Sequence, residues 1–173
     1  MRAWALGLGL GLVHLLGLGL GLVGVASAEP LKVGPAQIEL DPLWNGPPVA
    51  IEGSPLLVRR RDGALLTVTR AAAPNTAAWR SATRTAYLDE VEAGLLAAGA
   101  TKLGAKRKQL GKDSVPVLDV TVRRQAPDGT TEIVAVRLLL FRTVTIAAAA
   151  AAPDSRAGRT LAEAAVATLV PQR

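Results

Sequence analysis

The stretch from Leu118 to Leu138 reads LDVTVRRQAPDGTTEIVAVRL, with apolar and polar residues alternating over 118–123, then one turn, then a strand-like run that includes the apolar residues 133–136. In the turn Pro127-Asp128-Gly129, the proline fixes the first dihedral angle, the aspartate closes the turn and the glycine accepts a positive φ. A period of two is typical of β-strands, so this stretch predicts an antiparallel hairpin.

The turn also sets the register of the hairpin. If Ala126 faces Thr130, the apolar pairs that share one face are Val122–Val134, Val120–Val136 and Leu118–Leu138. A slip of one residue would move all of them to the other face. The same register predicts Asp119 opposite Arg137 on that other face, as an exposed ion pair worth at most about 1 kcal/mol.

A second hairpin is predicted upstream, where Arg61-Asp62-Gly63 separates the apolar runs 56–60 and 64–70. A three-residue loop that ends in glycine suits a type I turn followed by a left-handed residue. This register would place Val58 opposite Leu66 and Leu56 opposite Val68.

Between the two hairpins the pattern indicates a helix over Thr76–Ala98, with Thr76 as N-cap after Pro74-Asn75 and Gly99 as the breaker. The residues at helical spacing, which predict one buried stripe, are Tyr87, Val91, Leu95 and Ala98. Trp79, in the same segment, and Trp44, upstream, are expected to anchor the core.

The remaining segments complete an α+β fold. Strands are expected at 36–40 and at 100–110, the second with Lys102, Lys106 and Lys108 on one side. A reversal near Phe141-Arg142-Thr143 would separate two more strands, the last at 144–149. A helix over Ser155–Leu169 would turn Leu161, Ala165, Thr168 and Leu169 inward. The predicted order is β-β-β-α-β-β-β-β-α, an antiparallel β-sheet of about six or seven strands with two helices packed on it.

The first 28 residues have the pattern of a secretory signal peptide. Arg2 precedes an uncharged apolar run, and Ala26-Ser27-Ala28 offers small residues for cleavage. The alternative is an uncleaved membrane anchor, because the run is long enough to span a bilayer. Cleavage after Ala28 would leave a single domain at 29–173, exported to the periplasm or secreted.

Cleavage would also remove the only histidine, the residue type on which catalysis most often depends. The only histidine is His14 in the leader, and the chain has no cysteine. Catalytic arrangements based on Ser-His-Asp or Cys-His, and zinc or copper sites of the usual type, are therefore excluded from the mature chain. Asp89, Glu90 and Glu92 could in principle support carboxylate chemistry, but a solvated helix face is the expected reading. We expect no enzyme activity, no cofactor and no metal site.

The order of elements and a few landmarks resemble the PsbP-like and Mog-type α/β/α sandwich superfamily. The landmarks are Trp44, Pro74-Asn75, the helix with Trp79, Tyr87, Val91 and Leu95-Leu96 ending at Gly99, the strands around 111–122, the Asp128-Gly129 turn and the C-terminal helix. The resemblance covers nearly all of the mature chain. It implies a non-enzymatic accessory or adaptor protein, from an exported bacterial branch of unknown role. No sequence motif matches a functional residue of that superfamily to a position of this chain.

Three basic groups are candidates for a partner surface. They are Arg59-Arg60-Arg61, Lys106-Arg107-Lys108 and Arg123-Arg124. Charged residues near strand ends also discourage edge-to-edge aggregation, which is the simpler interpretation. The alternative is docking of an acidic partner or of anionic lipid headgroups. Removing the leader lowers the net charge only from +6 to +5, which is too modest for a nucleic-acid-binding surface.

These observations favour an exported protein that acts by binding another envelope protein. A carrier of a small apolar or anionic ligand is the second hypothesis, and a hydrolase that uses only carboxylates is the third. Contact with the membrane is expected only through the leader, if it is retained.

Overall fold

The computed structural model describes residues 30–44, 57–73, 81–97 and 99–172. The strands are β1 (Leu31–Val33), β2 (Ala36–Ile38), β3 (Leu57–Arg61), β4 (Ala64–Ala72), β5 (Thr101–Leu110), β6 (Val115–Gln125), β7 (Thr131–Leu140), β8 (Val144–Pro153) and β9 (Leu169–Pro171). The helices are α1 (Ser81–Leu96) and α2 (Arg156–Ala167).

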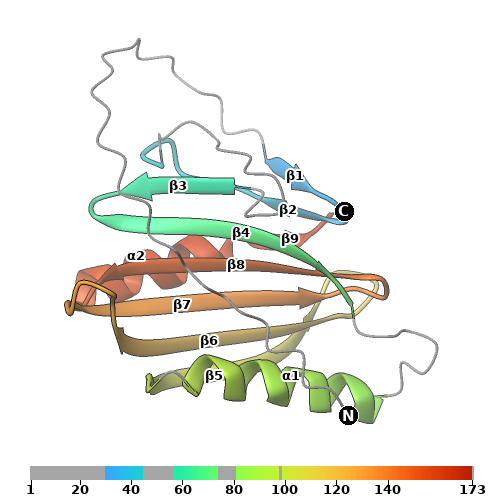
Figure 1. Cartoon of the computed structure of the whole chain (residues 1–173). Helices are drawn as coiled ribbons and strands as arrows, with labels where there is room; N and C mark the ends of the chain where they lie inside the picture. Colours follow the sequence, from blue (N-terminus) through green and yellow to red (C-terminus); the bar gives the residue numbers. More distant parts are fainter. Residues whose placement is uncertain (1–29, 45–56, 74–80, 98, 173) are drawn as a thin grey trace.

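The strands form two antiparallel sheets (Figure 1). The larger sheet has six strands in the order β3-β4-β8-β7-β6-β5, and the smaller has three in the order β1-β2-β9. The predicted α+β class is confirmed, with two helices and a main sheet of six strands. The second sheet was not part of the prediction, because β1 and β9 have only three residues each and show no periodicity.

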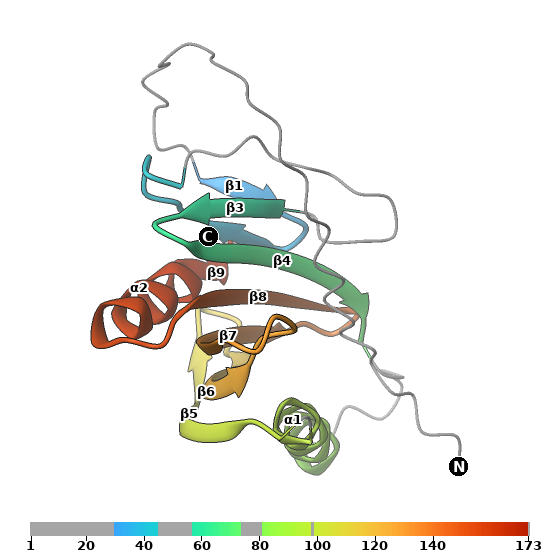
Figure 2. The same ribbon diagram turned by 60° about the vertical axis from the view of Figure 1, so that its left-hand side comes forward.

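The two helices lie on opposite faces of the large sheet (Figure 2). On one face, α2 and the small sheet enclose the larger core, which includes Ile38, Leu66, Val117, Leu139, Ile146 and Leu169. On the other face, α1 covers a second core that includes Leu88, Leu118, Val120, Val122, Val134 and Val136. Strands β6 and β7 therefore each direct successive residues alternately into the two cores.

The hairpin of β6 and β7 has the predicted register. Val122 pairs with Val134, Val120 with Val136, Leu118 with Leu138 and Asp119 with Arg137. The Ala126 amide donates to the Thr130 carbonyl at 2.7 Å, and the Gly129 amide donates to the Ala126 carbonyl at 2.9 Å, which closes the turn. Gly129 has a φ of +83°, the positive value that this turn requires.

The hairpin of β3 and β4 differs from the prediction by one residue. Arg61 pairs with Ala64, so the loop contains only Asp62 and Gly63, and Leu57 rather than Leu56 lies opposite Val68. Both loop residues have positive φ, 49° and 75°. Two such residues form the type I′ turn, whose twist matches that of the strands, and aspartate tolerates the left-handed conformation. The predicted pairing of Val58 with Leu66 is therefore wrong.

Helix α1 carries most of its predicted stripe. Tyr87, Val91 and Leu95 pack against the second core, and Leu88, which lies beside the stripe, is buried there. Gly99 has a φ of +77°, as expected of a residue that ends a helix. The predicted N-cap Thr76, Trp79 and Ala98 lie outside the described residues. Trp44 is buried in the larger core, as expected.

The reversal near residue 142 is confirmed, because the Phe141 amide donates to the Val144 carbonyl at 2.9 Å between β7 and β8. β8 extends to Pro153, further than predicted, and contains the whole alanine run 147–152. Alanine favours helices intrinsically, but β8 pairs along its length with both β4 and β7. Its small side chains at Ala148, Ala150 and Ala152 are buried in the core beneath α2.

Helix α2 begins after Ser155 and ends before Leu169, which opens β9. Ala165 is buried as predicted, and Leu161 packs against the core. Thr168 is the C-cap rather than an inward residue, because the buried stripe continues through Gly158, Ala162 and Val166.

Ser155 provides a direct test of how α2 begins. Its side-chain oxygen accepts a hydrogen bond from the Gly158 amide at 2.9 Å. Replacement of Ser155 with alanine leaves this amide without its partner, so the free energy of unfolding should fall by about 1 kcal/mol. Urea denaturation measures the change. A Ser155→Asp variant should retain stability, and equal losses in both variants would contradict the capping role.

Candidate functional site

The face of the large sheet that carries α2 is covered unevenly. α2 packs on β8, β7 and β4, whereas β5 and β6 extend beyond it. On this face of β5 and β6, Leu110, Val115 and Val117 pack in the larger core, and the remaining side chains are charged or polar, with Thr121 buried. Together with two residues of α2 they form a surface that we call the charged patch: Lys106, Lys108, Asp119, Thr121, Arg123, Arg159 and Glu163.

The strand register places the patch residues on one face. Lys106 lies opposite Asp119, which lies opposite Arg137, and Gly104 lies opposite Thr121. Directly opposed residues of antiparallel strands project to the same side. Arg137 and its neighbour Leu139 belong to the face of the larger core, so Lys106 and Asp119 project towards the α2 side as well.

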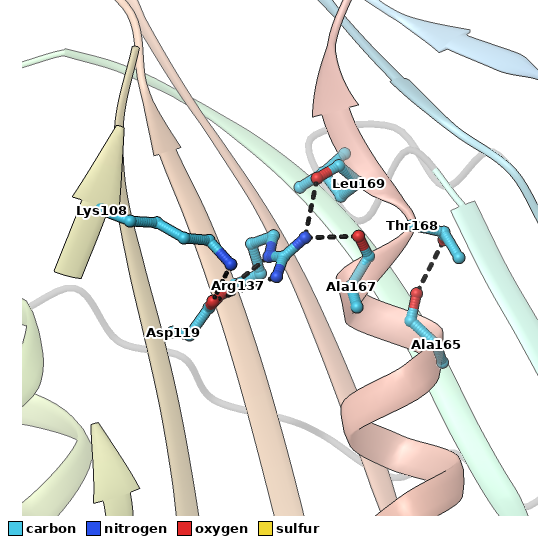
Figure 3. Close-up of polar contacts among 7 residues, drawn as sticks. All are labelled: Lys108, Asp119, Arg137, Ala165, Ala167, Thr168 and Leu169. Atoms are coloured by element: carbon cyan, nitrogen blue, oxygen red, sulfur yellow. Dashed lines mark hydrogen bonds and ion pairs between the residues drawn. The ribbon is translucent and has the colours of Figure 1, made fainter. Parts of the chain in front are cut away.

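Arg137 links the patch to the interior (Figure 3). Its Nε and Nη2 atoms donate to the two carboxylate oxygens of Asp119 at 2.6 and 3.0 Å. Its Nη1 atom donates to the carbonyl of Ala167, at the end of α2, and to that of Leu169, in β9, the latter at 3.4 Å. The Arg137 side chain is 7% exposed. The prediction of an exposed pair is therefore wrong, because the end of α2 and β9 cover the guanidinium.

Lys108 completes this network from β5, with its Nζ atom 2.9 Å from Asp119 Oδ2. Burial raises the pKa of Asp119, but hydrogen bonds from Arg137 and Lys108 outweigh it and hold the pKa below its ordinary value of 3.8. Asp119 is therefore ionised at neutral pH and stabilised by two cations.

This lowered pKa predicts an acid-dependent loss of stability. The Asp119 contribution is fully present above the unfolded-state pKa and is lost as the pH falls through 3.8 towards the lower folded value. The free energy of unfolding should therefore decrease between about pH 5 and pH 3. Urea titrations at both pH values measure this decrease. In an Asp119→Asn variant the decrease should be smaller, and an unchanged decrease would contradict the assignment.

The second cluster of the patch joins α2 to β6. Glu163 accepts hydrogen bonds from Arg159 Nε at 2.8 Å and from Thr121 Oγ1 at 3.0 Å, both at Oε1. Burial raises the pKa of Glu163. Hydrogen bonds from Arg159 and Thr121 and the positive charge of Lys106 lower it by more, so the pKa lies below its ordinary value. Glu163 is thus an anion held among polar partners, and it fixes the position of Arg159.

The structure separates the three basic groups of the sequence. Arg59, Arg60 and Arg61 lie in β3, at the opposite edge of the sheet from β5. Arg61 forms ion pairs with Asp41 at 2.9 Å and Asp62 at 3.2 Å.

The other two groups divide between the two faces. Lys106, Lys108 and Arg123 lie on the charged patch, and Arg123 pairs with Asp154 at 2.9 Å. Arg107 projects to the α1 side and contacts Asp89 at 2.6 Å and Glu92 at 3.1 Å. Arg124, beside Glu132 at 2.8 Å, lies on the same side as Arg107.

Lys102 also lies on the α1 side, where it pairs with Glu92 at 2.5 Å. The prediction that it shares a side with Lys106 and Lys108 is wrong, because the register shifts between Lys102 and Gly104. A bulge inserts one residue and so reverses the faces that follow it. The carboxylates of Asp89 and Glu92 are paired with these cations, and the Glu92 side chain is only 15% exposed.

The residues that the sequence did not single out are Arg159 and Glu163. They are spaced i, i+4 on α2, a spacing that favours ion pairs on helices. That spacing could identify the pair, but only the packing of α2 beside β6 brings it to the patch.

No family model matches the chain, and no curated protein matches it either. Among solved structures, it is similar to cyanobacterial PsbP (CyanoP) from Synechocystis sp. PCC 6803, with a TM-score of 0.57 and 15% sequence identity. The match covers 89% of this chain and 98% of that chain. The chain therefore has a PsbP-like fold, as the order of its elements predicted.

No helix among the described residues is long and apolar enough to cross a membrane. Within those same residues, no group of three or more histidine, aspartate or glutamate side chains is arranged to hold a metal ion.

Proposed function

We propose that this chain is an exported, non-enzymatic accessory protein that binds another protein of the bacterial cell envelope through the charged patch. Residues 1–28 act as a signal peptide that is removed after Ala28, and residues 29–173 form the binding domain. The PsbP-like fold is consistent with this role, and the leader pattern supports export.

The observation that carries the proposal is the charged part of a sheet face that α2 leaves uncovered. The patch offers four cationic side chains, Lys106, Lys108, Arg123 and Arg159, against two anionic ones, Asp119 and Glu163, and Asp154 pairs with Arg123 at its border. Its charges are organised by hydrogen bonds and are partly exposed, so they are available to a partner in a defined arrangement. Such complementarity governs specificity and association rate more than affinity.

Capture from an envelope extract tests this function. We expect the wild-type protein to retain a specific partner, and we expect a Lys106→Glu variant to lose it because the reversed charge repels an acidic surface. A Lys32→Glu variant is the matched control, since Lys32 is exposed in β1 on the other sheet. Equal capture by both variants, or a large thermal shift with a lipid and no captured protein, would contradict the proposal.

The export part of the proposal is tested separately by N-terminal sequencing of the protein from the envelope. We expect the chain to begin at Glu29. A protein that begins at Met1 would contradict removal of the leader.

A further inference from the structure

Gly104 lies in the floor of the charged patch, where it has no side chain between β5 and Arg159. A Cβ atom placed on Gly104 would lie 3.9 Å from the Nη2 atom of Arg159, so the guanidinium extends from α2 over this glycine. Gly104 also stands directly after the register shift in β5. The arginine of one element thus reaches across β6 to the edge strand.

Within the described part of the chain, only one of the guanidinium nitrogens of Arg159 is hydrogen-bonded. Its Nε atom donates to Glu163. Among the residues that the structure describes, no carboxylate contacts its Nη atoms. Its side chain is 44% exposed. The Nη groups are donors that match the planar geometry of a carboxylate.

Lys106 stands beside this position. It follows Gly104 by two residues on the same face, is exposed, and forms no ion pair within the portion of the chain that the structure describes. Thr121, which donates to Glu163, lies opposite Gly104, so Lys106 lies close to the Arg159–Glu163 pair. Lys108 follows two residues later, so the cations recur at the spacing of alternate residues in a strand, about 6.8 Å.

We infer that this site binds an extended acidic segment of the partner protein, with one carboxylate held by Arg159 and Lys106 above Gly104. The next carboxylate on the same side of the segment meets Lys108, which also pairs with Asp119 but is 39% exposed. This inference rests on the proposed function and specifies the chemistry of the partner. β5 is the edge strand of the sheet, so a chain can approach the site along it.

A synthetic peptide separates this inference from the capture experiment. The probe is a ten-residue peptide of alternating glutamate and threonine. It is added to isotope-labelled protein purified from the envelope. Binding is followed by NMR as changes in the chemical shifts of the backbone amides of 101–110 and of the Arg159 Nε–H group. We expect saturable shifts at these positions. A peptide with glutamine in place of glutamate should produce none.

Two variants with the same charge change test the role of Arg159. Arg159→Gln should weaken binding of the acidic peptide by about tenfold, because it removes charge-assisted hydrogen bonds. Arg156→Gln removes an exposed arginine from the same helix and should change the affinity by less than about twofold. Unchanged amide spectra elsewhere confirm that both variants are folded.

Three results would overturn the inference. They are equal weakening by Arg156→Gln and Arg159→Gln, absence of peptide binding at millimolar concentration, and binding of phosphatidylglycerol vesicles without binding of the peptide. Each of these leaves the captured envelope partner of the proposed function in place, so the two failures are distinguishable.

Discussion

Replacement of Arg137 with methionine should lower the free energy of unfolding by about 3 kcal/mol, the low end of the range for breaking a buried ion pair by removing one partner, because Lys108 still contacts Asp119. Asp119 would lose two hydrogen bonds while remaining half-buried, and the carbonyls of Ala167 and Leu169 would lose their donor. Those carbonyls connect α2 and β9 to the large sheet, so the loss affects both sheets. Urea denaturation at pH 7 measures the change.

Arg124→Met is the matched control for this prediction. It removes an arginine from the same hairpin, where its partner is Glu132 and its side chain is 28% exposed. A partly solvated pair contributes at most about 1 kcal/mol, so its loss should be small. Similar losses in the Arg137 and Arg124 variants would show that Arg137 does not hold the two sheets together.

Replacement of Gly158 with alanine should cost about 3 kcal/mol, at the upper end of the usual range for overpacking. A Cβ atom at Gly158 would lie 2.1 Å from the carbonyl oxygen of Pro153 and 3.2 Å from its carbonyl carbon. Both clashes involve backbone, so no side-chain rotation relieves them. α2 must instead move away from the end of β8. Thermal and urea unfolding both measure the loss.

Gly94→Ala makes the same chemical change, but it is expected to raise the free energy of unfolding. Gly94 lies inside α1, and a Cβ atom there would meet nothing within 4 Å. Alanine is the better helix former by up to about 1 kcal/mol, so this variant should be more stable than the wild type. If Gly158→Ala unfolds no more readily than Gly94→Ala, the close approach of α2 to β8 is wrong.

The contrast between the two hairpins shows how far sequence determines register. Pro127 restricts the turn between β6 and β7 to one solution, and the pairing of Asp119 with Arg137 follows correctly. Asp62-Gly63 allows both a three-residue loop and a type I′ turn, and the structure has the latter. Which of the two turns forms depends on the twist of the neighbouring strands, and the residues of the turn do not determine that twist.

The charged patch could be predicted only in part. Lys106, Lys108 and Arg123 were identified as basic residues near strand ends, but their common face depends on how β5 pairs with β6, and the bulge before Gly104, which turns Lys102 to the other face, has no distinctive sequence pattern. Arg137 was assigned to an exposed face because β9, which covers it, is too short to predict. Arg159 and Glu163 join the patch through packing of α2 beside β6, a tertiary contact.

Hydrogen–deuterium exchange of the protein alone and bound to its captured envelope partner tests most directly whether the charged patch is the binding surface. We expect the partner to slow exchange in β5 and in the segment 156–163 of α2, with little change in α1, which lies on the opposite face. Slower exchange confined to α1, or to β1 and β2, would contradict this assignment.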